Sequence, residues 1–142
     1  MAKIEIKNLT YYYPETKYPS LSDINISIGA GELAVLVGSS GSGKSTLLRT
    51  ISGLIPGFYQ GKLEGYVYID GDKLNQLSRR EIAQKVALLF QEPEHQIVKT
   101  KVVNEIAFSM ENIGGKPQVM RRRIAEVSSA LDLVAELERN VN

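Results

Sequence analysis

Five short stretches of the chain carry the hydrophobic patterns of β-strands. Residues 33–37 (LAVLV) and 86–90 (VALLF) are uninterrupted apolar runs, which are typical of strands buried on both faces of a parallel sheet. Residues 3–9 and 23–28 alternate between polar and apolar positions, which predicts strands with one buried face. Residues 63–69 (LEGYVYI) are also typical of a strand. We therefore expect a small antiparallel sheet beside a parallel core.

Helical patterns separate or follow these stretches. Apolar residues recur at helical spacing through residues 44–55, and a proline and a glycine come next. Residues 78–85 open on a Ser-x-x-Glu capping box, which predicts a short helix. Residues 102–112 are moderately helical, and an amphipathic pattern extends over residues 117–137. Strands alternating with helices predict an α/β fold with a parallel sheet.

Composition narrows the class of protein only a little. The chain has 142 residues, enough for one domain, and 43% of them are hydrophobic. Its net charge of +1 gives no reason to expect nucleic acid as a partner. It has no cysteine, which excludes disulfides and thiolate metal sites, and its apolar runs are too short to span a membrane. The N-terminus has no secretory apolar segment, so we expect a cytoplasmic protein.

The strongest chemical signal is the glycine-rich stretch GSSGSGKST. It matches the phosphate-binding pattern G-x-x-x-x-G-K-[ST]. Glycines allow a tight loop whose N–H groups converge on a polyanion, the lysine adds a charge for the outer phosphates, and the serine hydroxyl after it can bind Mg²⁺. We expect ATP to contact every residue of this loop: Gly38, Ser39, Ser40, Gly41, Ser42, Gly43, Lys44, Ser45 and Thr46.

A flexible Gly/Ser loop is the alternative explanation of this stretch. The four fixed positions should match by chance in roughly one of 200 chains of this length. The context makes chance a poorer explanation still, because a phosphate-binding loop needs a buried strand before it and a helix after it. Residues 33–37 and 44–55 have those two patterns. We therefore expect a nucleoside-triphosphate-binding loop.

Together these residues resemble the ATP-binding subunits of ABC transporters. The stretch LSDINISIGAGELAVLVGSSGSGKSTLL, residues 21–48, resembles the run of that family from its second strand to its phosphate loop. Tyr13, in a YYYP stretch after the first predicted strand, stands where the family has an aromatic residue. The glutamine Gln91, in FQEPEHQIV, stands in the place of the family's glutamine loop. That stretch and VVNEIAFSMENIG look most like the energy-coupling-factor importers of vitamins and of cobalt or nickel ions.

The resemblance implies a fold, ligands and partners. The fold would be an incomplete P-loop NTPase (RecA-like) α/β fold, with a parallel core sheet, a small antiparallel β subdomain and the start of a helical subdomain. Residues 1–142 would form the N-terminal portion of a nucleotide-binding domain. Tyr13 would stack on adenine, although Tyr11 or Tyr12 could be the stacking ring instead, and Mg²⁺ would contact Ser45 and Gln91. Partners would be transmembrane transporter subunits and a second nucleotide-binding domain. The protein would lie on the inner face of the cell membrane.

The sequence also departs from this family. The family's LSGGQ signature, its acidic strand with a catalytic glutamate, and its switch histidine are absent from these 142 residues. We therefore expect ATP binding with negligible hydrolysis by this chain alone. A binding fragment without turnover and a soluble ABC-type ATPase remain alternatives. Because the family places its acidic strand between residues 33–37 and 86–90, we also expect these two runs to lack a neighbour and the chain not to be a stable monomer.

Overall fold

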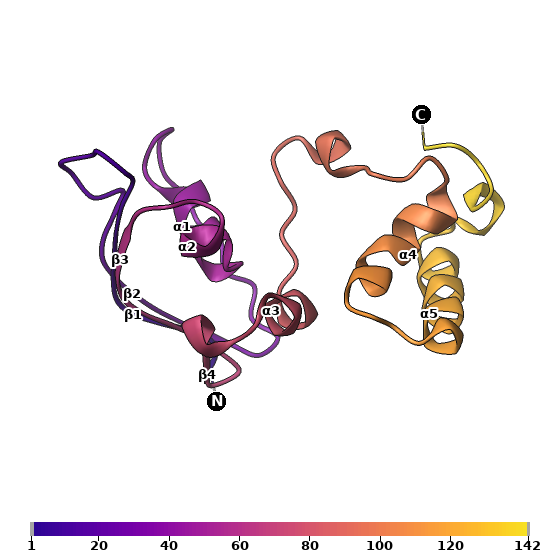
Figure 1. Ribbon diagram of the computed structural model, residues 1–142, viewed down its shortest axis with the longest axis horizontal. Coiled ribbons are helices and arrows are strands. Elements are labelled where there is room, and N and C mark those ends of the chain that lie inside the picture. Colours follow the sequence, from indigo (N-terminus) through magenta and orange to yellow (C-terminus); the bar gives the residue numbers. More distant parts are fainter. Residues whose placement is uncertain (1, 142) are drawn as a thin grey trace. The chain divides into compact units, whose positions relative to one another are not determined.

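A computed structural model describes residues 2–141 of the chain. The chain forms two compact units, residues 1–88 and residues 89–142 (Figure 1). The first unit contains the sheet and the glycine-rich loop, and the second is helical. No helix within residues 2–141 is long and apolar enough to cross a membrane.

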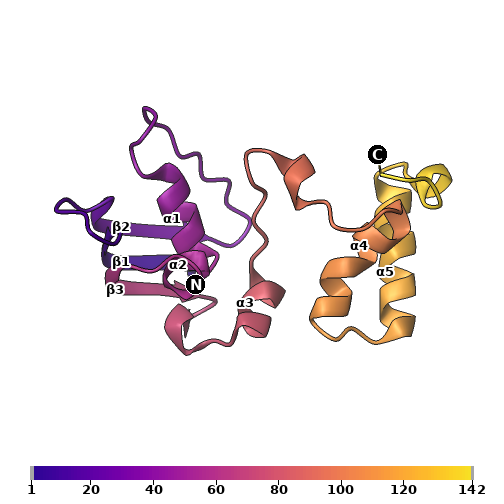
Figure 2. The same ribbon diagram turned by 45° about the horizontal axis from the view of Figure 1, so that its top comes forward.

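The sheet of the first unit has four antiparallel strands. They are β1 (Ala2–Tyr12), β2 (Leu21–Gly29), β3 (Lys62–Ile69) and the short β4 (Asp72–Lys73), in the order β2-β1-β3-β4. Central strand β1 pairs with β2 on one side and β3 on the other (Figure 2). The small antiparallel sheet predicted from residues 3–9 and 23–28 is therefore confirmed, and the strand predicted at residues 63–69 belongs to it as β3.

Short helices supply the other side of the core in this unit. They are α1 (Lys44–Ile51), α2 (Leu54–Gly57), the 3₁₀ turn η1 (Leu74–Gln76) and α3 (Arg79–Lys85). The capping box that starts α3 is present as predicted. Sheet and helices together enclose a core made of the buried residues Ile6, Leu9, Tyr11, Leu21, Leu47, Ile55, Val67, Ile69 and Leu74. Helix α1 contributes Leu47 to this core, which fixes the helix against the sheet.

The two strands predicted for a parallel core are not formed. Residues 33–37 lie outside any strand, and Leu33, Val35 and Val37 are 89%, 77% and 86% exposed. Residues 86–90 also lie outside any strand, and Leu89 is 76% exposed. A strand needs a neighbour to accept and donate its backbone hydrogen bonds. Among residues 2–141 no strand of the sheet lies beside either run, so neither run forms a strand despite its apolar sequence.

The second unit is built on two helices, α4 (Val102–Asn112) and α5 (Pro117–Ala130), with 3₁₀ turns η2 (Pro93–Gln96) and η3 (Val134–Glu136). Both predicted helices are confirmed, but α5 ends at Ala130, not near residue 137. Asp132 has a φ of 57°, in the left-handed region, which a continuing α-helix does not allow. The chain therefore turns after α5, and the apolar residues beyond it belong to a separate turn.

Candidate nucleotide-binding site

Residues 38–43 form an exposed loop that leads into α1. Gly43 is the N-cap of α1, and its φ of 90° is a left-handed value that residues with a Cβ rarely adopt. A Cβ built on Gly43 would lie 2.5 Å from the carbonyl oxygen of Ser20, the residue that precedes β2. The second fixed glycine of the motif is therefore required both by its backbone angle and by the close passage of another chain segment.

Replacing Gly43 with alanine should destabilise the first unit by about 2 kcal/mol, because a left-handed alanine costs roughly 1–2 kcal/mol and the clash with Ser20 adds to it. At one fixed protein concentration the melting temperature should fall by about 8–16 °C. Gly57→Ala is the matched control, since no atom lies within 4 Å of a Cβ at that glycine. Equal melting temperatures for the two variants would contradict this account of the loop.

Lys44 folds back over the loop that precedes it. Its Nζ donates hydrogen bonds to the carbonyl oxygens of Gly38, at 2.8 Å, and Ser39, at 2.6 Å. It also donates to Ser42 Oγ at 3.3 Å. An ammonium group has three protons, so all of them are directed at the loop. An incoming phosphate oxygen would accept the proton that Lys44 Nζ now donates to Ser42 Oγ, the longest of the three bonds. The carbonyl oxygens of Gly38 and Ser39 would continue to hold the ammonium group at the loop.

The start of α1 supplies further donors at the same place. The first N–H groups of a helix have no acceptor within it, and no side chain caps α1. The first turn of α1 has no acidic residue to compete with an anion, and Gly38 to Ser42 are all exposed. Backbone N–H groups, a helix dipole and one lysine therefore converge on a solvent-accessible position. This combination suits a phosphate chain.

Ser45 is the residue of this loop best placed to serve a metal ion. Its side chain is exposed in the first turn of α1, directly after Lys44. No group of three or more His, Asp or Glu side chains within residues 2–141 could hold a metal ion by itself. Mg²⁺ commonly takes one or two protein oxygens and completes its shell with phosphate and water oxygens. The residues present therefore fit a magnesium ion carried by a nucleotide, with the Ser45 hydroxyl as a ligand.

The three consecutive tyrosines have different surroundings. The side chain of Tyr11 is fully buried, and its hydroxyl donates to the carbonyl oxygen of Gln60 at 2.7 Å. Burial, with a smaller effect of nearby Tyr13, raises the pKa of Tyr11 above its ordinary value, which keeps that hydroxyl protonated. Tyr11 is therefore a core residue, and of the three rings only those of Tyr12 and Tyr13 have any exposed surface.

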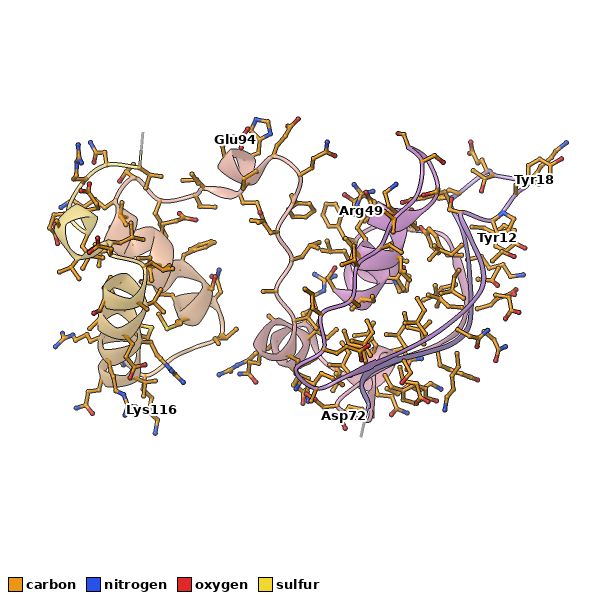
Figure 3. All side chains as sticks on the ribbon, turned by 180° about the vertical axis from the view of Figure 1, so that it is seen from behind. Tyr12, Tyr18, Arg49, Asp72, Glu94 and Lys116 are labelled. Atoms are coloured by element: carbon orange, nitrogen blue, oxygen red, sulfur yellow. The ribbon has the colours of Figure 1, made fainter. Side chains whose placement is uncertain are left out.

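Tyr13 is the ring on the side of the phosphate loop. Its hydroxyl lies 3.3 Å from Oγ1 of Thr46, in the first turn of α1. Tyr12 instead lies near Lys62 of β3, with that ammonium 5.9 Å from its ring centre, and points away from α1 (Figure 3). Both tyrosines line a cleft of about 510 Å³ with Pro14 and residues 60–62. The expected role of Tyr13 in base stacking agrees with this geometry but stays a prediction.

Thr46 differs from the other residues of the predicted loop because its side chain is buried. Its Oγ1 faces the Tyr13 hydroxyl, and its carbonyl oxygen accepts a bond from Thr50 Oγ1 at 2.9 Å. The threonine side chain therefore connects the loop to the tyrosine in this structure, and its predicted contact with nucleotide would be made through its backbone N–H. That contact stays a prediction.

Gln91 belongs to the second unit, where it is exposed. It precedes η2, in which the ring of His95 contacts Glu92, with Nδ1 and Oε2 2.8 Å apart. The backbone N–H of Phe90 donates to Gln96 Oε1 at 3.0 Å, which closes the turn that carries Gln91. The role of Gln91 at the metal or at water stays a prediction.

Arg49 is a site residue that the sequence patterns did not single out. Its Nη1 donates to the Tyr13 hydroxyl at 3.5 Å, and its guanidinium carbon lies 4.8 Å from the centre of the Tyr59 ring. The signal in the sequence was its position three residues after Thr46, because residues three apart lie on one face of a helix. Without the fold, nothing in the sequence connects Arg49 to Tyr13.

The family model of the ABC transporter matches residues 21–142. The chain belongs to the ABC transporter family. A putative ABC transporter ATP-binding protein of Pyrococcus abyssi is 40% identical over 121 residues, which are 85% of this chain and 43% of that protein. One of Bacillus anthracis is 39% identical over 143 residues, which are 100% of this chain and 25% of that protein. This chain thus spans less than half the length of each of these relatives.

Solved structures show the same fold. The structure of cbiO1 of Clostridium perfringens, part of the ABC transporter complex cbiONQ, has a TM-score of 0.77 and 22% sequence identity to this chain. The matched region is 98% of this chain and 54% of the cbiO1 chain. The ATP-binding cassette MJ0796, solved as a dimer with ADP and Pi, has a TM-score of 0.73 and 25% sequence identity to this chain. The matched region is 98% of this chain and 62% of the MJ0796 chain. The α/β fold of P-loop NTPases expected from the sequence is therefore confirmed, although residues 33–37 and 86–90 do not form strands.

Proposed function

We propose that this ABC chain binds Mg²⁺-ATP as the N-terminal portion of the nucleotide-binding domain of a transporter subunit. One observation carries the proposal. Lys44 and the start of α1, which no side chain caps, lie at one exposed loop, and the Tyr13 hydroxyl contacts Thr46 in the first turn of the same helix. The phosphate chain would lie against the loop, and adenine against Tyr13. The relatives named as ABC transporter ATP-binding proteins support this proposal.

The residues of the loop would divide the work of binding. The N–H groups of the loop and of the start of α1 would bind the phosphate oxygens, and Lys44 would neutralise part of their charge. The Ser45 hydroxyl would take one position on Mg²⁺, a bound ion that screens charge on the outer phosphates. Gln91 would provide a second contact to the ion or to water. These residues position and neutralise the phosphates, and none of them is an obvious base for activating water.

Energy supply for an importer is the transport role that we propose for the longer polypeptide. The resemblance of residues 90–98 and 102–114 to the energy-coupling-factor type supports it, and so does the fold of cbiO1, which is part of a transporter complex. Transmembrane subunits and a second nucleotide-binding domain would then be partners, and MJ0796 is an example of a dimer with this fold. The domain would lie at the inner face of the membrane, bound through those subunits.

Calorimetric titration with nucleotides of decreasing phosphate length tests the binding proposal. We expect the 142-residue chain to bind ATP and ADP in the presence of Mg²⁺ and to bind AMP at least about tenfold more weakly, because the loop's charge-assisted hydrogen bonds go to the outer phosphates. Inorganic tripolyphosphate should compete with ATP. Equal affinities for ATP and AMP would show that the glycine-rich loop does not hold the phosphate chain.

Hydrolysis assays separate a transporter ATPase from a binding module without turnover. The 142-residue chain should release phosphate from ATP no faster than its Lys44→Ala variant, because phosphoryl transfer also requires an oriented water and a held metal. A polypeptide extended beyond Asn142 should gain Lys44-dependent turnover if the subunit is an ATPase. Robust Lys44-dependent turnover by the 142-residue chain would mean that a base exists among these residues.

A further inference from the structure

Arg49 is a half-buried cation that faces aromatic rings. It lies on α1, one turn beyond Thr46 (Figure 3). Its guanidinium packs on the ring of Tyr59 at 4.8 Å, and its Nη1 reaches the hydroxyl of Tyr13 at 3.5 Å. No Asp or Glu within residues 2–141 makes an ion pair with it. The direction of this side chain is therefore set by Tyr59 and Tyr13 rather than by an opposite charge.

Tyr13 is held at its hydroxyl and through its ring. Thr46 and Arg49 both contact the hydroxyl, and both belong to α1, the helix that begins at the phosphate loop. The ring meets that of Tyr11 edge to face, with centres 4.9 Å apart and planes at 78°. Because Tyr11 is fully buried in the core, it is a fixed support. Rotation of Tyr13 about its side-chain bonds would break the contacts of its hydroxyl and the contact of its ring with Tyr11.

We infer that Arg49 is a positioning residue that sets the distance between the base-binding ring and the phosphate loop. This rests on the proposed function, in which Tyr13 stacks on adenine. Tyr59 orients the guanidinium, the guanidinium and Thr46 fix the Tyr13 hydroxyl, and the ring is thereby tied to α1. A ring held in its binding orientation loses less conformational freedom when a base arrives. The contribution concerns the base alone, because the guanidinium of Arg49 contacts the Tyr13 hydroxyl and the Tyr59 ring and makes no hydrogen bond to residues 38–45.

A positioning role for Arg49 predicts different effects on the binding of ATP and of inorganic tripolyphosphate, whereas a purely structural role predicts the same effect on both. A ligand with a base, such as ATP, needs both the ring and the loop at a fixed separation. Inorganic tripolyphosphate needs only the loop. Loss of Arg49 should therefore weaken ATP selectively, whereas general loosening of α1 would weaken both ligands, because the start of α1 supplies donors to the phosphates.

The test compares ATP and tripolyphosphate binding by the 142-residue chain and its variants. Arg49→Met, which keeps an unbranched apolar side chain, should weaken ATP about three- to tenfold, the range for loss of one hydrogen bond, and leave tripolyphosphate within about 1.5-fold. Arg49→Lys, which retains a cationic donor, should fall between Arg49→Met and the unchanged chain. Equal weakening of both ligands by Arg49→Met would overturn the inference.

A double-mutant cycle isolates the contact itself. In a Tyr13→Phe background the hydroxyl is absent, so Arg49→Met should have no additional effect on ATP binding. An undiminished effect in that background would show that Arg49 acts elsewhere and would overturn the inference. If Arg49→Met does not fold, Thr46→Val removes the other partner of the hydroxyl, and the same selective loss of ATP affinity is expected. Equal loss of both ligands with Thr46→Val would also count against it.

Tyr13→Ala separates failure of this inference from failure of the proposed function. If Tyr13→Ala leaves ATP affinity unchanged, Tyr13 does not stack on the base and the proposed function of that ring fails. If Tyr13→Ala weakens ATP binding but Arg49→Met does not, the stacking stands and the positioning role of Arg49 fails. Thermal melting of each variant, at one concentration, identifies any that have lost the fold of the first unit.

Discussion

Lys44→Ala should weaken ATP binding by about ten- to a hundredfold, corresponding to the roughly 1.5–3 kcal/mol of a charge-assisted hydrogen bond to phosphate. The structure gives the physical reason. The ammonium is already held at the mouth of the loop by the carbonyl oxygens of Gly38 and Ser39, so little conformational freedom remains to be lost when a phosphate arrives. Titration of labelled ATP against both proteins measures the effect.

Two controls keep this result interpretable. Lys17→Ala removes the same charge from an exposed loop of the first unit and should leave affinity within about 1.5-fold, because an exposed charge is screened by solvent. Thermal melting of Lys44→Ala reports whether loss of the three bonds to the loop has unfolded α1. Equal affinities of the folded Lys44→Ala variant and the unchanged chain would refute the central proposal about this loop.

The isolated 142-residue chain should associate with itself at micromolar concentration. Residues 33–37 combine an unpaired backbone with apolar side chains that are 77–89% exposed at positions 33, 35 and 37. Burying one such side chain contributes about 1.5–3 kcal/mol, and a bare strand edge offers hydrogen bonds to a second chain. Sedimentation velocity should show oligomers or aggregates, and the melting temperature should depend on concentration.

A charge placed in the middle of residues 33–37 tests the cause of this association. Val35→Lys should shift the chain toward the monomer, because a lysine on an edge opposes pairing with another chain. Tyr18→Lys is the matched control, since Tyr18 is 83% exposed but lies in the loop between β1 and β2. If the unchanged chain is a monomer with a concentration-independent melting transition, residues 33–37 do not drive association and the prediction fails. An equal shift toward the monomer in both variants would show that the added charge itself, and not its position within residues 33–37, opposes association.

Local chemistry explains why much of the first unit could be predicted from sequence. The phosphate loop and the start of α1 follow from glycines and a lysine within nine residues, residues 38–46. The start of α3 follows from the Ser78–Glu81 capping box, whose hydrogen bonds join residues three apart. The alternating patterns of β1 and β2 predict one buried face for each strand, and this prediction uses only residues within the strand.

The remaining features depended on contacts that sequence patterns do not contain. The apolar run of residues 33–37 has the composition of a core strand, but a strand forms only where a neighbour supplies hydrogen bonds, and no such neighbour lies among residues 2–141. Tyr11 lies in β1 and Tyr13 follows its end, and only the tertiary packing decides that Tyr11 is buried and that the Tyr13 hydroxyl faces Thr46 of α1. Arg49 joins Tyr13 across 36 residues for the same reason. By itself the sequence therefore determined the glycine-rich loop and the start of α1, because these depend on neighbouring residues, whereas the tertiary structure decided which rings and charges surround them.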